Sequence, residues 1–173
     1  MIIGISGKCG SGKDTVASMI CGVYPELSIV SFATNVKAVT AIITGTTVSS
    51  QFTREGKSTV PKDMPYTCGK YQQIVGAGMR DMIDANVWIR PVLSNRNIVI
   101  ADVRYKNEAD AIKAAGGIII RVNRADVTSF LNGRDPLHAS EVDMDDYKCD
   151  HVIENNSTLD SLRQDVAKLL IVL

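Results

Sequence analysis

A chain of 173 residues favours one domain and is long enough to bury a sizeable hydrophobic core. Its 19 basic and 19 acidic residues cancel, so we do not expect the basic excess that a surface for a nucleic-acid polymer requires. The purely apolar runs, such as "LLIVL" at the end, are far too short to span a bilayer, so no membrane segment is expected either.

The first half of the chain opens on a strand, a turn and a helix. "MIIGIS" is a short apolar run, followed by glycines and then by an apolar pattern of helical period that begins near Lys13. A second strand over 27–32 is followed by a helix over 34–45, which Gly45 stops. Residues 46–66 are polar and hold Gly and Pro, so we predict a mobile loop. Helical patterns then cover roughly 68–80, which Thr67 can cap, and 84–93, which Pro91 perturbs.

The second half repeats this alternation. "NIVIADVR" (97–104) is the clearest buried strand, and a helix over 107–117 has an acid near its start and a glycine at its stop. A strand over 117–123 leads into the polar, irregular stretch 124–147. The chain closes with a strand over 150–155 and a helix from Thr158 to about Leu170.

Strands that alternate with helices throughout predict an α/β fold. The connections favour a parallel sheet, wound right-handed and covered by helices on both faces. The sequence holds no internal repeat and no low-complexity segment. We therefore predict one domain over 1–173.

The stretch Gly7 to Thr15, "GKCGSGKDT", lies between the first strand and the first helix. It matches a phosphate-binding loop, G-x-x-x-x-G-K-[S/T], at Gly7, Gly12 and Lys13, but Asp14 stands at the last position. Glycines let backbone N–H groups turn toward an anion, the helix start aims its positive end there, and Lys13 adds a charge for the outer phosphates. A glycine-rich turn without a ligand is the alternative, and the flanking strand and helix argue against it.

Asp14 has two interpretations. An acid in the first turn of a helix is stabilised by the helix dipole, by about 0.3–1 kcal/mol. Alternatively, Asp14 orders Mg²⁺ or its waters, while Thr15 gives a hydroxyl to a phosphate. The missing Ser/Thr argues against GTPase-type machinery, in which that hydroxyl holds the metal, but not against small-molecule kinases.

"GISGKCGSGKDT" resembles the "GKD" phosphate loop of phage-type deoxynucleoside monophosphate kinases, which share the nucleoside monophosphate kinase fold. Four further stretches resemble that family in the right order. They are "SFATNVKAVTAIITG", "TCGKYQQIVGAGMRDMIDANVWI", "IADVRYKNEADAIKAAGGIIIRVNR" and "HASEVDMDDYKCDHVIENN". The chain departs from the family at Val75, Gly76 and Ala77, where the family usually has G-T followed by an acid, and this puts base preference in doubt.

The resemblance implies a phosphate-loop fold of three α/β/α layers, with a mostly parallel five-stranded sheet and an inserted lid. It implies that ATP gives its terminal phosphoryl group to a deoxynucleoside 5′-monophosphate, with Mg²⁺ as cofactor. Such a transfer needs alignment, charge neutralisation and exclusion of water rather than covalent help. We expect the acceptor-side region over 46–80 and the lid over 124–147.

The loop and the resemblance together give a set of expected site residues. The ATP-binding residues are Lys8, Gly10, Ser11, Gly12, Lys13, Asp14, Thr15 and Asn155, with Asn156 beside it, and Asp14 is also the metal residue, directly or through water. The substrate-binding residues are Phe32, Lys37, Arg80, Trp88, Asp102 and Arg104. The catalytic residues are Lys13, Asp102, Arg124 and Arg134.

Several of these residues have a structural alternative. Asp102 follows a central strand, at the edge where such sheets bind ligands, but it can also cap the next loop. Arg104 can bind a phosphate or pair with Asp102. Arg80 can grip the acceptor phosphate or lie on the surface at a helix end. Trp88 can stack on the acceptor base or belong to the core.

The polar stretch 124–147 has alternatives of its own. Arg124 and Arg134 bracket it, and they either reach the ATP phosphates when a lid closes or remain solvated loop charges. His138 is expected to be structural, since this chemistry needs no histidine base. Glu141 is expected to pin the lid rather than to bind metal.

Other functions stay open on the sequence alone. Dephospho-coenzyme A kinase and phosphomevalonate kinase have related loops, and a nucleotide-binding regulatory module would keep the loop without needing the arginines. A homodimer also stays open. Cys9, Cys21, Cys68 and Cys149 form no C-x-x-C pair and have no histidines at zinc spacing, so we expect free thiols in a cytoplasm, that of the host cell if a phage or virus encodes the protein.

Overall fold

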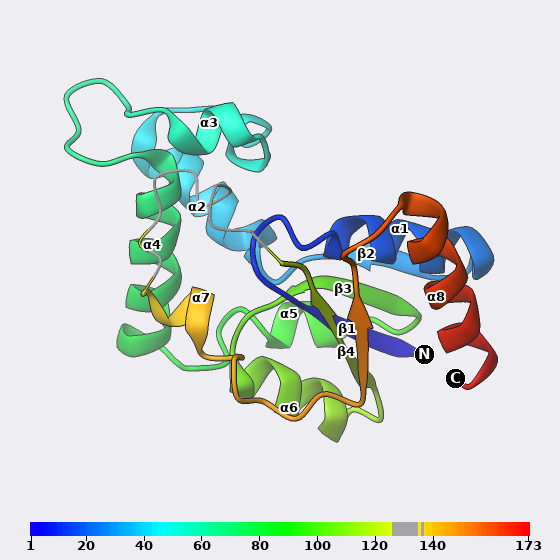
Figure 1. Cartoon of the computed structure of the whole chain (residues 1–173). Helices are drawn as coiled ribbons and strands as arrows, with labels where there is room; N and C mark the ends of the chain where they lie inside the picture. The colour runs from blue at the N-terminus through cyan, green and yellow to red at the C-terminus, as the bar shows by residue number, and fades with distance from the viewer. Residues whose placement is uncertain (126–134, 136) are drawn as a thin grey trace.

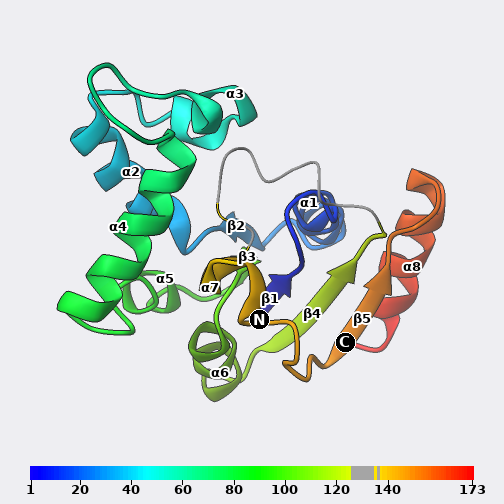
Figure 2. The same cartoon turned by 60° about the vertical axis from the view of Figure 1, so that its left-hand side comes forward.

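The computed structural model describes residues 1–125, 135 and 137–173. Its centre is a sheet of five strands in the order β2-β3-β1-β4-β5, and every strand pair in it is parallel (Figures 1 and 2). The strands are β1 (Ile2–Ser6), β2 (Ser28–Val30), β3 (Ile98–Val103), β4 (Ile118–Asn123) and β5 (His151–Glu154). The predicted parallel α/β sheet is confirmed.

Helices cover both faces of this sheet. On one side lie α1 (Lys13–Val23) and α8 (Leu159–Ile171), and on the other lie α5 (Arg90–Leu93) and α6 (Lys106–Ala114), as Figure 1 shows. Successive strand residues point to opposite faces, so Val99 packs into the α1–α8 core and Ile98 into the α5–α6 core. This is why the central strands are mainly apolar rather than alternating, with polar residues such as Asp102 and Arg121 toward their carboxyl ends.

A helical arm extends beyond the sheet edge that β2 forms (Figures 1 and 2). It consists of α2 (Ala33–Thr44), α4 (Cys68–Met82) and the segment between them. The predicted loop over 46–66 is not wholly irregular, because it contains the short helices η1 (Ser50–Phe52) and α3 (Arg54–Ser58). Polar side chains form the hydrogen bonds that hold these turns, and the pattern of apolar residues does not predict these bonds. Buried Gln51 bonds to Gln72 and to Thr46, and Thr53 caps α3.

Three other predicted elements differ in extent. Of the helical stretch over 84–93, only α5 is helical, since Pro91 fits the first turn of a helix but not its interior. Helix α6 ends at Ala114, before Gly116 turns the chain with a left-handed φ of 78°. The stretch predicted as irregular contains the short helix α7 (Ala139–Val142), whose start His138 caps through Nδ1. Among the described residues, no helix is long and apolar enough to cross a membrane.

Candidate active site

The loop between β1 and α1 has the backbone that its glycines predict. Gly10 and Gly12 have left-handed φ angles of 84° and 97°, and the N–H of Ser11 donates to the carbonyl of Lys8 at 3.1 Å. A side chain at Gly12 would strain the left-handed backbone, and its Cβ would displace the amide of Asn155. The Nδ2 of that amide donates to the carbonyl of Ser11 at 2.8 Å, so Asn155 braces the loop from the end of β5.

The polar side chains of the loop and of the first turn of α1 differ in exposure. Ser11 is fully buried, and its Oγ has no hydrogen-bond partner among the described residues. Asp14 and Thr15 are exposed in the first turn of α1, where a carboxylate and a hydroxyl face solvent beside the loop. A buried, unpaired hydroxyl inside such a loop is the kind of group that a bound oxyanion satisfies.

Lys13 and Lys37 are cations held in a partly desolvated place. Nζ of Lys13 lies 3.3 Å from the carbonyl of Lys8, and burial, followed by the charge of Arg104, lowers the pKa of its ammonium. Burial lowers the pKa of Lys37 to about 8, against the opposing charge of Asp102, and its Nζ lies 4.0 Å from the centre of the Phe52 ring. Burial disfavours the charged forms of these two lysines, so a bound anion would stabilise them.

Asp102, at the end of β3, accepts hydrogen bonds from the start of α2. Its carboxylate accepts from the N–H of Phe32 at 2.8 Å, from the N–H of Ala33 at 3.0 Å and from the hydroxyl of Ser31 at 2.5 Å. It thus satisfies the free N–H groups that begin a helix distant in sequence, rather than capping the loop that follows it.

We expect Asp102→Ala to lower the free energy of unfolding by about 2 kcal/mol, because three donors at the start of α2 lose a charged acceptor. Asp102→Asn keeps one acceptor oxygen and should cost about half as much. Urea unfolding of both variants measures this. Equal stability of parent and Asp102→Ala would mean that solvent replaces the carboxylate without loss.

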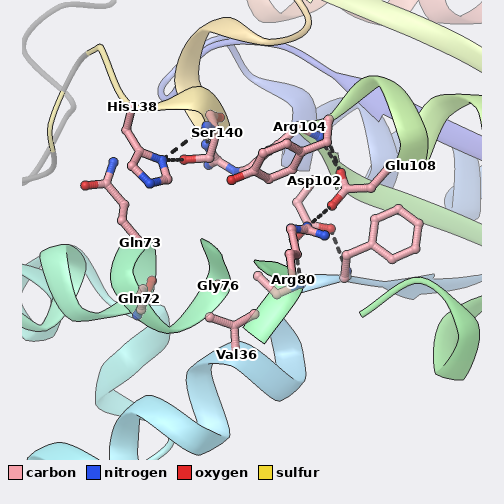
Figure 3. Close-up of a pocket in the computed structure, with 13 residues that line it drawn as sticks. Val36, Gln72, Gln73, Gly76, Arg80, Asp102, Arg104, Glu108, His138 and Ser140 are labelled. Carbon is pink, nitrogen blue, oxygen red and sulfur yellow. Dashed lines mark hydrogen bonds and ion pairs between the residues drawn. The ribbon is translucent and has the colours of Figure 1, made fainter. Parts of the chain in front are cut away.

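A pocket opens between the helical arm and the carboxyl end of β3 (Figure 3). Arg80 of α4 and Glu108 of α6 point toward each other across one wall, with Nη2 and Oε1 2.5 Å apart. The guanidinium of Arg80 also lies 4.1 Å from the centre of the Tyr105 ring. The lining residues are Phe32, Ala33, Val36, Gln72, Gln73, Gly76, Arg80, Asp102, Arg104, Tyr105, Glu108, His138 and Ser140.

Glu108 is a site residue that the sequence analysis missed. It is buried, and its Oε2 accepts from the N–H of Arg104 at 2.7 Å and from the N–H of Tyr105 at 3.1 Å. Burial raises the pKa of its carboxyl to about 7, although Arg80 and the two N–H groups oppose this. The available signal was an acid in the first turn of a predicted helix, which is usually exposed.

A set of ion pairs ties the segment around α7 to the sheet edge and the phosphate loop. Arg104 pairs with Glu141 at 2.8 Å, rather than with Asp102, and donates to the carbonyl of Ser140. Lys8 of the loop pairs with Asp145, and Arg121 of β4 reaches the same carboxylate. Glu141 therefore holds the segment around α7 against Arg104, and Lys8, predicted to bind ATP, has a protein partner here.

The remaining predicted residues are spread over different environments. Trp88 is buried against Val36 and Val75, and its Nε1 donates to the carbonyl of Gly76 at 3.1 Å, so its contacts are those of the core alternative. Val75 and Gly76, where the chain departs from the family pattern, are thus neighbours of this tryptophan. Arg124 is exposed, and Arg134 lies outside the described residues, as do residues 126–133 and 136 of the predicted lid. The N–H of Ala125 donates to Asn156.

A strand, a glycine loop with a buried lysine and a helix, set at the carboxyl edge of a parallel sheet, define a phosphate-binding domain of the phosphate-loop class. Solved structures agree on the fold. A shikimate kinase from Aquifex aeolicus vf5 covers 98% of this chain and 96% of its own, with a TM-score of 0.54 and 15% identity. A shikimate kinase from Acinetobacter baumannii, in complex with shikimate, covers 99% and 93%, with a TM-score of 0.50 and 14% identity.

The solved structures agree only on the fold, whereas sequence comparison identifies the family. The family described as deoxynucleotide monophosphate kinase matches residues 47–166. A protein of Acanthamoeba polyphaga mimivirus, named provisionally as a deoxynucleotide monophosphate kinase, is 32% identical over 184 aligned positions, covering 92% of this chain and 91% of its own. The chain belongs to the deoxynucleotide monophosphate kinase family, and it is a nucleotide kinase.

Proposed function

We propose that the protein transfers the terminal phosphoryl group of ATP to a deoxynucleoside 5′-monophosphate. One observation carries the proposal: the pocket at the carboxyl end of β3 is lined by Arg80 and Arg104, and Arg104 is also a charged neighbour of buried Lys13 in the phosphate loop. The transfer joins two anions, so cations must converge where the two sites meet.

We assign a role to each site residue from its position in the structure. The loop N–H groups and Lys13 bind the ATP phosphates, and Lys13 neutralises the charge that grows on the transferred group. Arg80 and Lys37 hold the acceptor monophosphate, while Asp102 fixes the start of α2 against β3. Arg104, fixed by Glu141, completes the positive wall. Arg124 and Arg134 remain candidates for closing over ATP, in a lid over 124–147 that excludes water.

The residues fit magnesium in the way that ATP-dependent kinases usually hold it. The described residues contain no cluster of three His, Cys, Asp or Glu side chains that could hold a metal by itself. Mg²⁺ in such sites is bound by one or two carboxylates together with the substrate phosphates. Exposed Asp14, in the first turn of α1, is the carboxylate that would hold it here, directly or through water. When bound, Mg²⁺ neutralises phosphate charge.

We expect Asp14→Asn to raise the Mg²⁺ concentration needed for half-maximal rate about tenfold, because the variant loses the carboxylate but keeps its shape. The measurement is the rate as a function of free Mg²⁺ at constant ATP. Overlaid titrations of the variant and the parent would leave Asp14 only its interaction with the helix dipole.

The proposed acceptor is tested by a coupled assay of ADP release. The panel holds the four common deoxynucleoside monophosphates, the matching ribonucleotides, dephospho-coenzyme A and phosphomevalonate. We expect turnover with at least one deoxynucleoside monophosphate and none with the last two compounds. ATP binding without any acceptor turnover would instead support a regulatory nucleotide-binding module.

A further inference from the structure

The guanidinium of Arg80 is fixed on several sides by the protein. Nη2 contacts Glu108 Oε1 at 2.5 Å, the group lies over the Tyr105 ring, and Nη1 reaches the carbonyl of Ala85 at 3.5 Å. Its Nε is buried and has no hydrogen-bond partner among the described residues. Arg80 is therefore held in place before a ligand arrives, and it keeps a donor unpaired in a residue that lines the pocket.

Both carboxylate oxygens of Glu108 have protein partners. Oε1 faces Arg80, and Oε2 accepts from the N–H groups of Arg104 and Tyr105. A carboxylate would also repel a phosphate. Glu108 can thus act on a bound monophosphate only through the residues that it holds.

We propose that Glu108 is the positioning residue of the acceptor site: its carboxylate holds Arg80 of α4 against Tyr105 and joins the arm to the start of α6. This inference rests on the proposed function, in which Arg80 binds the acceptor phosphate. Acceptor affinity then depends on the charge of a residue that never touches the acceptor. Arg80 is on α4 and Glu108 is on α6, so their ion pair also connects the arm to a helix that covers the sheet.

The charge of Glu108 changes near neutral pH. The titratable and charged groups that face it are Arg80 from α4, Asp102 from β3, and Arg104 and Tyr105 from the turn between β3 and α6. Burial raises its carboxyl pKa to about 7. The carboxylate is therefore charged at pH 8 and mostly protonated at pH 6, where Arg80 loses its ionic partner. Acceptor binding should weaken as the pH falls through about 7.

Glu108→Gln tests the proposal because glutamine imitates the protonated acid. At pH 8 we expect the KM for the monophosphate to rise about tenfold, with the KM for ATP unchanged. The ratio of the variant KM to the parent KM should then fall toward one at pH 6, because the parent itself becomes neutral. The acceptor phosphate ionises at about pH 6 in both enzymes and cancels from the ratio. Asp110→Asn, an exposed acid on the same helix, is the matched control and should change neither KM.

A ratio that does not change with pH, or equal effects on both substrates, would overturn the positioning role. A substrate-free measurement separates this from failure of the proposed function. The ¹⁵N signal of Arg80 Nε in the parent should titrate with a midpoint near pH 7, and the signal should not titrate in Glu108→Gln. Absence of acceptor turnover in the parent would refute the proposed function alone. An Arg80 signal that does not change with pH in the parent would refute the positioning of Arg80 by Glu108.

Discussion

Lys13→Met should lower kcat by about a hundredfold or more while leaving the protein folded. In the proposed reaction the ammonium neutralises charge that grows on the transferred group, and a preorganised donor of this kind is typically worth 10²–10³ in rate, about 3–4 kcal/mol. Methionine fills most of the volume of the lysine stem, so the packing at the start of α1 is kept. The measurement is single-turnover phosphoryl transfer at saturating ATP and acceptor.

The fold should survive because the charge of Lys13 is costly to bury. Burial lowers the pKa of its ammonium in the folded protein, which means that the charged form opposes folding at neutral pH. Removing the charge should leave the thermal unfolding temperature unchanged or raise it. Lys168→Met on α8, an exposed lysine paired with Asp165, is the control and should change neither rate nor stability. Near-parent turnover in folded Lys13→Met would refute the assignment of the loop.

Arg80→Ala should raise the KM for the monophosphate about 10- to 100-fold and leave the KM for ATP nearly unchanged. A hydrogen bond between charged groups contributes about 1.5–3 kcal/mol, and 1.4 kcal/mol is a factor of ten in affinity. Initial rates with each substrate varied in turn, at pH 8, provide the two constants. An equal rise in both constants would place Arg80 away from the acceptor.

The single variant also leaves Glu108 buried without its ionic partner. The carboxyl pKa of Glu108 should then rise above its value of about 7, because Arg80 is the charge that lowers it most. The double variant Arg80→Ala, Glu108→Gln removes this side effect. If Arg80 binds the acceptor, the double variant should be as weak for the monophosphate as Arg80→Ala and more stable toward urea at pH 8. Recovered acceptor affinity in the double variant would mean that the unpaired glutamate, not the missing arginine, caused the loss.

The sequence predicts the position of Asp102 but not its hydrogen-bond partners. Its place after an apolar strand predicts a position at the carboxyl edge of the sheet, where the structure has it. The sequence did not predict which helix it would bind. Its donors lie 69 to 71 residues away, at the start of α2, because β2 and β3 are neighbours in the sheet although distant in the chain.

The sequence by itself determined the elements with strong local patterns. The central strands are mainly apolar because both faces of the sheet are covered, and the glycines before Lys13 allow the left-handed backbone of the loop. Tertiary structure decided the pairing of buried charges. Arg80 and Glu108 are 28 residues apart, and Arg104 and Glu141 are 37 apart. No local sequence pattern predicts such a pair. The stability of a buried ion pair depends on which elements the sheet order brings together and on how much water they exclude.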